Sequence, residues 1–265
     1  MPLSRPVDAI EAARRTPADA EAARRILPLL DLTSLRGDET AAEIEALCCR
    51  ALRHAVAAVC IYPGFLPVAC SVLAGSAVRI ATVANFPEGG DDIGAAAAEV
   101  AAAVAAGAQE VDVVAPLAAI RAGDLESVAE LVEACRAAAR PTTLLKLILE
   151  TGLLAEPSLI TAVARTAVMA GVDFLKTSTG KRFPGATLEA AAALLEVIAE
   201  TGGRVGLKLS GGIRTLADAA PYLALVDATM GRDWANASRL RFGASALLDD
   251  LVRVLQEASP GAGPC

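Results

Sequence analysis

The sequence contains very little histidine and no CxxC pair of cysteines. Among its 265 residues there is one histidine, His54, and none of the six cysteines forms a CxxC pair. Structural zinc sites draw their ligands from clustered cysteines and histidines, so this composition argues against such a site. We therefore expect reduced thiols, no metal ion and no cofactor.

The chain also lacks an excess of basic residues. Its formal net charge is −7 and its isoelectric point is about 4.9. A protein that binds the phosphate backbone of nucleic acids usually carries an excess of Lys and Arg, so nucleic acid is not an expected partner. A local cationic pocket is still compatible with this balance.

Long apolar runs are absent as well. The Ala-rich stretch GAAAAEVAAAVAAGA is interrupted by Glu99, and no segment reaches the roughly 18 apolar residues that a membrane-spanning helix requires. The first residues mix arginines with acidic residues and contain no apolar segment typical of a secretory signal. We expect a cytoplasmic protein that does not contact membranes.

Short apolar runs rich in β-branched residues recur along the chain, separated by stretches rich in Ala, Leu and Glu with helical spacing. Helix start signals, such as Thr40 with Glu43, Pro157 and Thr187, fall between the runs. Near-continuous apolar strands are typical of a parallel sheet covered by helices. The predicted strands are 26–33, 57–63, 78–86, 110–116, 142–150, 173–179, 204–210 and 240–245.

Eight βα units in one chain of this length indicate an α/β fold, a single (β/α)₈ TIM barrel. An open doubly wound sheet is the alternative, but the segment DLTSLRGDET after the first strand has no GxGxxG turn. We assign the barrel domain to residues 25–258, an extra N-terminal helix to 1–24 and a loose tail to 259–265. No Pro-, Gly- or Ser-rich linker divides the sequence.

Three lysines stand in neighbouring predicted strands near their carboxyl ends, where TIM barrels form their active sites. They are Lys146, Lys176 and Lys208. A buried ammonium group costs several kcal/mol unless it is paired or loses its proton. Clustered ammonium groups repel one another, so one of the three can become a neutral nucleophile that attacks a carbonyl. Lys146 taken alone is explained as well by an ion pair with Asp112 or Glu150.

Small and hydroxyl residues follow two of these lysines, in KTSTG and KLSGG, and the last predicted strand ends at Ser245 before a helix. Glycines allow backbone N–H groups to approach a phosphate, and the loops after the seventh and eighth strands often bind phosphate in TIM barrels. The residues alone thus indicate an amine nucleophile beside a phosphate pocket, and Schiff-base chemistry on a sugar phosphate.

The segments LLDLTSL, CIYPGF, ATVANFP, EVDVVAP, DFLKTSTGK, VGLKLSGGIRT and RFGAS together resemble the deoxyribose-phosphate aldolases, class I aldolases on a TIM barrel. The resemblance runs from about residue 25 to about 250. It implies reversible cleavage of 2-deoxy-D-ribose 5-phosphate to acetaldehyde and D-glyceraldehyde 3-phosphate. The expected partners are therefore small sugar phosphates and aldehydes.

The resemblance also implies a role for individual residues. Lys176 is the expected Schiff-base lysine, Lys208 the second active-site lysine and Asp112 the proton-handling carboxylate. Lys146 is expected to pair with Asp112, Asp31 to contact a substrate hydroxyl or an active-site lysine, and Cys60 to line the wall. The expected phosphate-binding residues are Gly180, Lys181, Gly211, Gly212 and Ser245.

Three positions depart from the family pattern. Ala246 replaces a second serine in the last phosphate loop, Leu209 follows Lys208 where a smaller residue is common, and the segment RFPGAT after the sixth strand is bulky. These changes affect the expected substrate affinity more than the mechanism.

Two other functions fit parts of the pattern: another lysine-dependent barrel aldolase of the transaldolase type, and a catalytically silent barrel that binds sugar phosphates. The small-residue face of the helix around 95–106 suits a homodimer contact and packing on the barrel equally well.

Overall fold

The structure is a computed structural model that describes residues 6–258. Its eight strands are all parallel and form a closed barrel in chain order, with β8 paired to β1. The (β/α)₈ barrel predicted from the sequence is confirmed. The strands are β1 (Leu30–Ser34), β2 (Ala58–Ile61), β3 (Arg79–Ala84), β4 (Glu110–Val114), β5 (Leu144–Ile148), β6 (Phe174–Lys176), β7 (Gly206–Ser210) and β8 (Leu240–Ala244).

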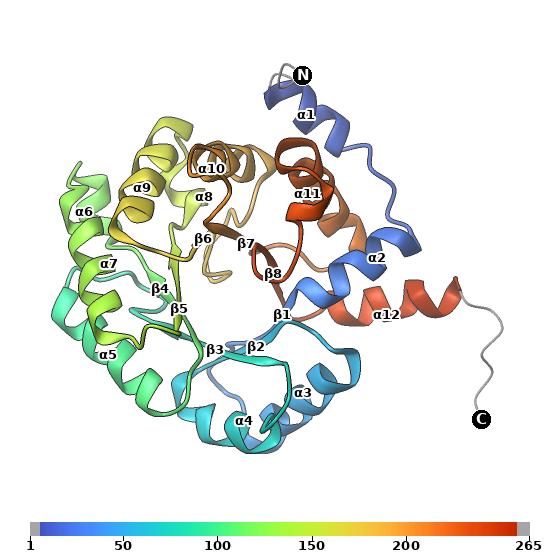
Figure 1. The fold of residues 1–265 in the computed structure, drawn as a ribbon, viewed down its shortest axis with the longest axis horizontal. Coiled ribbons are helices and arrows are strands. Elements are labelled where there is room, and N and C mark those ends of the chain that lie inside the picture. The colour runs from blue at the N-terminus through green and yellow to red at the C-terminus, as the bar shows by residue number, and fades with distance from the viewer. Residues whose placement is uncertain (1–5, 259–265) are drawn as a thin grey trace.

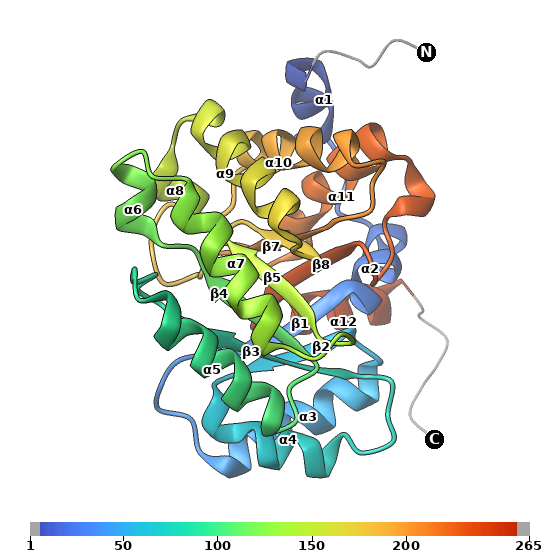
Figure 2. The same ribbon diagram turned by 60° about the vertical axis from the view of Figure 1, so that its left-hand side comes forward.

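Helices surround the barrel on its outside (Figures 1 and 2). The predicted start signals are present: Thr40 and Glu43 form a capping box, Pro157 opens a helix and Thr187 caps another. The helices are α1 (Pro6–Ala13), α2 (Ala20–Ile26), α3 (Ala41–His54), α4 (Leu66–Val72), α5 (Ile93–Ala105), α6 (Leu117–Arg121), α7 (Glu126–Ala138), α8 (Thr151–Leu154), α9 (Pro157–Ala170), α10 (Leu188–Glu200), α11 (Leu216–Met230) and α12 (Leu247–Glu257), with 3₁₀ turns at Leu27–Leu29, Pro63–Phe65 and Arg232–Trp234.

The main apolar core lies between the strands and the helices. Because successive side chains of a strand point to opposite faces, every second residue faces this layer. Leu207 and Leu209 of β7 belong to it, and both are fully buried. A second, small cluster lies inside the barrel on the side of β2 and β3, and consists of Leu35, Ala58, Cys60, Ala81 and Val83. A third cluster consists of Val114, Leu117 and Ile148, and charged side chains occupy much of the remaining interior.

Two details of the N-terminal part differ from the prediction. The strand expected at 26–33 begins only at Leu30, because α2 runs to Ile26 and a 3₁₀ turn follows. The segment before the barrel contains two helices rather than one, and the expected boundary at residue 24 falls inside α2. α1 packs on α10 and α11, whereas α2 packs on α11 and α12. The tail expected at 259–265 lies outside the described residues.

Within residues 6–258, no helix combines the length and apolar character needed to cross a bilayer. α5, the Ala-rich helix, packs against α7 and buries Ala96, Val100, Ala103 and Val104. Its small residues thus serve packing on the barrel, while its other face is exposed.

Candidate active site

Three lysines and one carboxylate meet inside the barrel. Lys176 and Lys208 are register partners on β6 and β7. Lys176 Nζ lies 2.8 Å and Lys208 Nζ lies 2.7 Å from Asp112 Oδ2, and Lys146 Nζ lies 2.8 Å from Asp112 Oδ1. The expected pair between Lys146 and Asp112 is thus present. A single carboxylate on β4 accepts hydrogen bonds from all three ammonium groups.

Most of the charged residues of the site lie further from the carboxyl ends of their strands than expected. Lys146, Lys208 and Asp112 are each the central residue of a five-residue strand, and Asp31 is the second residue of β1. Only Lys176 is the last residue of its strand. Strand ends cannot be located to the residue from apolar runs, because loop residues next to a strand are often apolar too.

The surroundings separate the three lysines chemically. Burial lowers the pKa of Lys176 from its usual value, although Asp112 acts in the opposite direction, and the charge of Lys208 lowers it further. Burial would also lower the pKa of Lys208, but Asp112 and Asp31 outweigh it and hold that pKa well above its usual value. Asp112 and Glu110 likewise outweigh burial and raise the pKa of Lys146. Lys176 is therefore the lysine that gives up its proton most readily.

The carboxylate of Asp112 is held in its charged form. Burial would raise the pKa of this carboxyl, but Lys146, Lys176 and Lys208 together hold it well below its usual range. Asp112 is fully buried, so solvent does not weaken these interactions.

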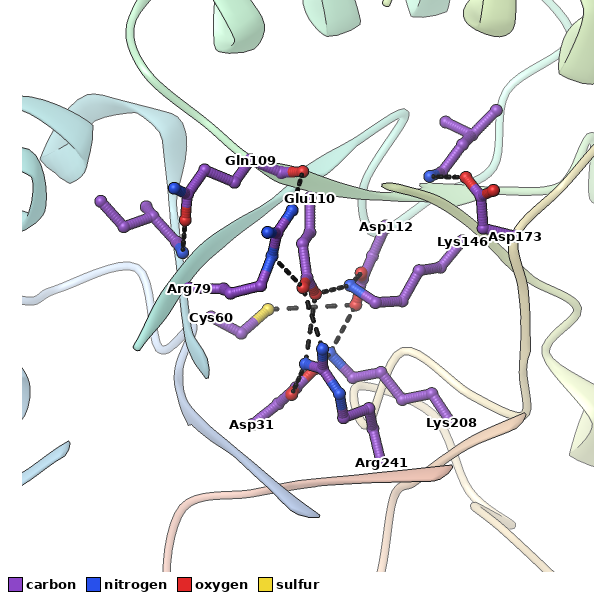
Figure 3. A network of polar contacts seen from close by, with 12 residues as sticks. Asp31, Cys60, Arg79, Gln109, Glu110, Asp112, Lys146, Asp173, Lys208 and Arg241 are labelled. Carbon is purple, nitrogen blue, oxygen red and sulfur yellow. Dashed lines mark hydrogen bonds and ion pairs between the residues drawn. The ribbon is translucent and has the colours of Figure 1, made fainter. Parts of the chain in front are cut away.

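Further charged side chains contact Lys146 and Lys208 (Figure 3). Asp31 Oδ2 lies 2.6 Å from Lys208 Nζ, and its Oδ1 lies 2.6 Å from Arg241 Nη1. Asp31 therefore contacts an active-site lysine, one of its two expected partners. Arg241 Nη2 lies 3.0 Å from Glu110 Oε1, and Glu110 Oε2 lies 2.7 Å from Lys146 Nζ. All of these groups are nearly or fully buried.

Glu110 and Arg241 were not predicted from the sequence, although a signal for both was present. Glu110 stands two residues before Asp112 in EVDVV, and Arg241 stands two residues before Gly243 in RFG. Residues two apart in a strand share a face. Glu110 therefore points into the barrel because Asp112 does, and Arg241 lies on the same face of β8 as Gly243, which leads to Ser245.

Cys60 lies in the barrel interior rather than in the wall of the cavity as expected. Its Sγ is 4.0 Å from Asp112 Oδ2, and burial raises the pKa of its thiol. A thiol of this kind is not a nucleophile in its resting state.

Phe174 fills the centre of the barrel between charged side chains. Lys146 Nζ lies 6.0 Å from the centroid of its ring, and Arg241 Cζ lies 5.7 Å from it. A side chain on Gly206, opposite in register, would collide with this ring. The glycine is required there because it leaves room for the aromatic ring.

A cavity of about 420 Å³ opens above Lys176. Of the buried charged residues, only Lys176 lines this cavity; Lys146, Lys208, Asp112 and Asp31 do not. The residues expected to bind phosphate, which follow β6, β7 and β8 in the chain, all line it, namely Gly180, Lys181, Gly211, Gly212 and Ser245. The fold thus brings the amine and all five of these residues to one cavity.

Two more cations at this cavity were missed, Arg36 and Arg214. Arg36 is paired with Asp38 and Glu43, with Nε and Nη2 each 2.8 Å from a carboxylate oxygen. Arg214 is exposed at the cavity. Arg214 follows the paired glycines in GGIRT, which were expected to bind phosphate, so its position in the sequence was a signal.

The loop that contains RFPGAT packs closely on the β7 loop. Ala186 N donates a hydrogen bond of 3.0 Å to Gly211 O, and a side chain on Gly185 would collide with the backbone of Gly211. Its beginning is fixed by Thr179, whose Oγ1 donates a hydrogen bond of 2.5 Å to Glu150 Oε2. The segment that departs from the family pattern therefore contacts Gly211, one of the glycines expected to bind phosphate.

Asn85 and Glu150, polar residues near predicted strand ends, have structural contacts. The Asn85 side chain forms hydrogen bonds with the backbone of Gly90 and Val114. Asn85 and Glu150 both have positive φ angles. Within residues 6–258, no group of three or more His, Cys, Asp or Glu side chains is placed to hold a metal ion.

The chain and its fold have counterparts among known proteins. The family model described as DeoC/LacD family aldolase matches residues 25–251. A solved structure from Coccidioides immitis, provisionally assigned as a deoxyribose-phosphate aldolase, is 28% identical to this chain. Its TM-score is 0.77, and the match covers 97% of this chain and 99% of that one.

Two further solved structures share the fold at lower identity. A provisionally assigned deoxyribose-phosphate aldolase from Toxoplasma gondii is 22% identical, with a TM-score of 0.82 over 90% of this chain and 95% of that one. The tetrameric deoxyribose phosphate aldolase from Aeropyrum pernix is 23% identical, with a TM-score of 0.72 over 97% and 99%. The family match covers nearly all of the barrel and confirms the resemblance seen in the sequence: the chain belongs to the DeoC/LacD family of aldolases.

Proposed function

We propose that this protein is a deoxyribose-phosphate aldolase that cleaves 2-deoxy-D-ribose 5-phosphate through a Schiff base on Lys176. The observation that carries the proposal is the position of Lys176 among the three lysines. It alone lines the cavity, and it alone has a lowered pKa. A nucleophilic lysine must be both accessible to the substrate and unprotonated.

The first step forms the covalent bond. The neutral amine of Lys176 attacks C1 of the open-chain sugar, and the aldehyde oxygen leaves as water, which yields an iminium ion. Loss of the C3 hydroxyl proton then allows the C2–C3 bond to break. Its electron pair moves toward the iminium nitrogen, C3 becomes the aldehyde carbon of glyceraldehyde 3-phosphate, and an enamine remains on Lys176.

Asp112 handles the proton in this scheme. It is the carboxylate that contacts the Lys176 amine, at 2.8 Å. Acting through a water molecule, it accepts the C3 hydroxyl proton and later returns a proton to C2 of the enamine, so that its own charge is restored. Hydrolysis of the resulting iminium releases acetaldehyde and the free amine. Lys208, with its raised pKa, stays charged and fixes the carboxylate in place.

The phosphate group is assigned to the far side of the cavity. Gly180, Gly211 and Gly212 all have positive φ angles, a conformation that exposes backbone N–H groups to an anion. Lys181 and Ser245 add an ammonium group and a hydroxyl group to the same cavity. The guanidinium of Arg214 supplies a further donor in the same cavity. It can compensate for Ala246, which stands where the family pattern has a second serine hydroxyl.

The test is reduction with borohydride in the presence of acetaldehyde, followed by peptide mass spectrometry. We expect a two-carbon adduct on Lys176 and none on Lys208 or Lys146. A folded protein without an adduct on Lys176 contradicts the mechanism and favours the catalytically silent barrel.

Substrate choice needs a second measurement. Turnover of 2-deoxyribose 5-phosphate should greatly exceed turnover of unphosphorylated 2-deoxyribose, because the phosphate cavity holds the substrate in place. Faster turnover of a ketone donor such as a ketose phosphate would instead identify an aldolase of the transaldolase type.

A further inference from the structure

Six buried charged groups form a closed ring inside the barrel. Starting at Lys208, each group contacts the next: Asp31 at 2.6 Å, Arg241 at 2.6 Å, Glu110 at 3.0 Å, Lys146 at 2.7 Å, Asp112 at 2.8 Å, and Lys208 again at 2.7 Å. Cations and carboxylates alternate without exception. Figure 3 shows the ring members converging from β1, β4, β5, β7 and β8.

The charges of this ring sum to zero. Three cations, Lys146, Lys208 and Arg241, stand against three carboxylates, Asp31, Glu110 and Asp112. Lys176 is the seventh group, attached to the ring only through Asp112. Protonation of Lys176 therefore adds one uncompensated charge to a fully buried site, which is costly at low dielectric.

Two other groups face the ring. Cys60 remains a neutral thiol, since burial raises its pKa. Arg79 Nε lies 2.9 Å from Glu110 Oε1, and its side chain is 36% exposed, so solvent screens its charge in part; the charge that remains is positive and also disfavours a proton on Lys176. The titratable and charged groups around Lys176 are thus Asp31, Cys60, Arg79, Glu110, Asp112, Lys146, Lys208 and Arg241.

We propose that Glu110 and Arg241 are positioning residues of the aldolase reaction: they close a neutral ring that keeps Lys146 and Lys208 as ammonium ions and leaves Lys176 without a carboxylate of its own. This inference rests on the proposed Schiff-base role of Lys176. Neither residue lines the cavity, so neither touches the substrate. They act through the charge of the ring.

Neutralising the two residues has opposite consequences. Without the Arg241 charge, the ring carries a surplus negative charge, which favours protonation of Lys176 and raises its pKa. Without the Glu110 charge, the surplus is positive and the pKa of Lys176 falls. Removing both charges restores neutrality. A purely structural role predicts no such reversal of sign, because damage to packing disturbs the site in the same way in both variants.

The experiment measures the initial rate of cyanoborohydride trapping of acetaldehyde on Lys176 as a function of pH, by mass spectrometry. We expect the midpoint of the profile to move up by about one pH unit in Arg241→Gln and down by about one unit in Glu110→Gln. Arg241→Lys keeps the charge and is the matched control, with a midpoint near that of the wild type.

The double variant Arg241→Gln/Glu110→Gln should return the midpoint to within a few tenths of a unit of the wild type. Midpoints that stay fixed, or that move in the same direction in both single variants, overturn the proposal. If a single variant does not fold, the double variant still tests the proposal. A midpoint in the double variant that differs from the wild-type midpoint contradicts the role of charge balance. An absent adduct in the wild type refutes the proposed function instead, so the two failures are distinguishable.

Discussion

Along β7, Leu207 and Leu209 pack beneath the helices, whereas Lys208 and Ser210 point into the barrel and make polar contacts. The same alternation occurs in β6, where Leu175 faces outward and Lys176 inward. Outward positions bury apolar surface, which stabilises the fold through the hydrophobic effect. Inward positions hold charges that pair at large desolvation cost and contribute little net stability. One face of each strand thus supports the fold, and the other supports the chemistry.

The largest difference between the two faces, in the effect of substitution on turnover and on stability, is expected between Lys176 and Leu175 of β6. Lys176→Ala should lower turnover by more than about 10³-fold, because the nucleophile is lost. Its thermal stability should change little, since Lys176 is not a member of the neutral ring. Turnover and melting temperature are measured on the same preparation.

Leu175→Ala is the matched control on the outward face. It should cost about 2–5 kcal/mol of unfolding free energy by denaturant titration, while the turnover per folded molecule is kept. If Lys176→Ala unfolds and Leu175→Ala does not, the division of roles between the two faces is wrong.

Asp112 belongs to the inward face, but its substitution should lower both turnover and stability. Asp112→Asn removes the carboxylate shared by three lysines, so we expect turnover to fall by about 10²–10⁴-fold. Breaking buried ion pairs should also cost about 3–5 kcal/mol of unfolding free energy. Kinetic assays and denaturant titrations test the two effects separately. Normal turnover in Asp112→Asn would exclude it as the proton-handling group.

The inward face should also determine how stability depends on pH. Asp31, Glu110 and Asp112 have lowered pKa values in the folded protein, so it binds fewer protons than the unfolded chain in acid. Their contribution is complete above the pKa values of the unfolded carboxyls, near pH 4, and is lost as the pH falls further. Melting temperatures recorded at decreasing pH should drop in this range. A melting temperature that stays constant down to pH 2 would contradict the ion-pair network.

The smallest effect is expected at the mouth of the cavity. Lys181→Ala removes an exposed ammonium group, so we expect KM for the phosphorylated substrate to rise by about tenfold, a loss comparable with one charge-assisted hydrogen bond. The kcat and the stability should be nearly unchanged. The kinetics of unphosphorylated 2-deoxyribose are the control, and an equal loss with that substrate would remove Lys181 from the phosphate site.

Much of the site was visible in the sequence because strands of a parallel barrel are short apolar runs, and charged residues inside them are conspicuous. Lys146, Lys176 and Lys208 were recognised in this way, and the glycines after β6 and β7 indicated loops that line the cavity. Glu110 was passed over because it stands at the first position of its strand, where a charged residue is ordinarily exposed. Arg241 was also passed over, although it is the second residue of β8, as Asp31 is of β1.

The amino-acid sequence was enough to predict the eight strands, their helices and the lysines and carboxylates of the site, because these depend on local periodicity and composition. The access of Lys176 to the cavity and its lowered pKa, which set it apart from Lys146 and Lys208, arise only in the folded barrel. Barrel closure places Lys176 at the floor of the cavity and pairs Lys146 and Lys208 with carboxylates from β1 and β4. Burial and charge balance are sums over groups far apart in the chain, and they become defined only when the strands meet.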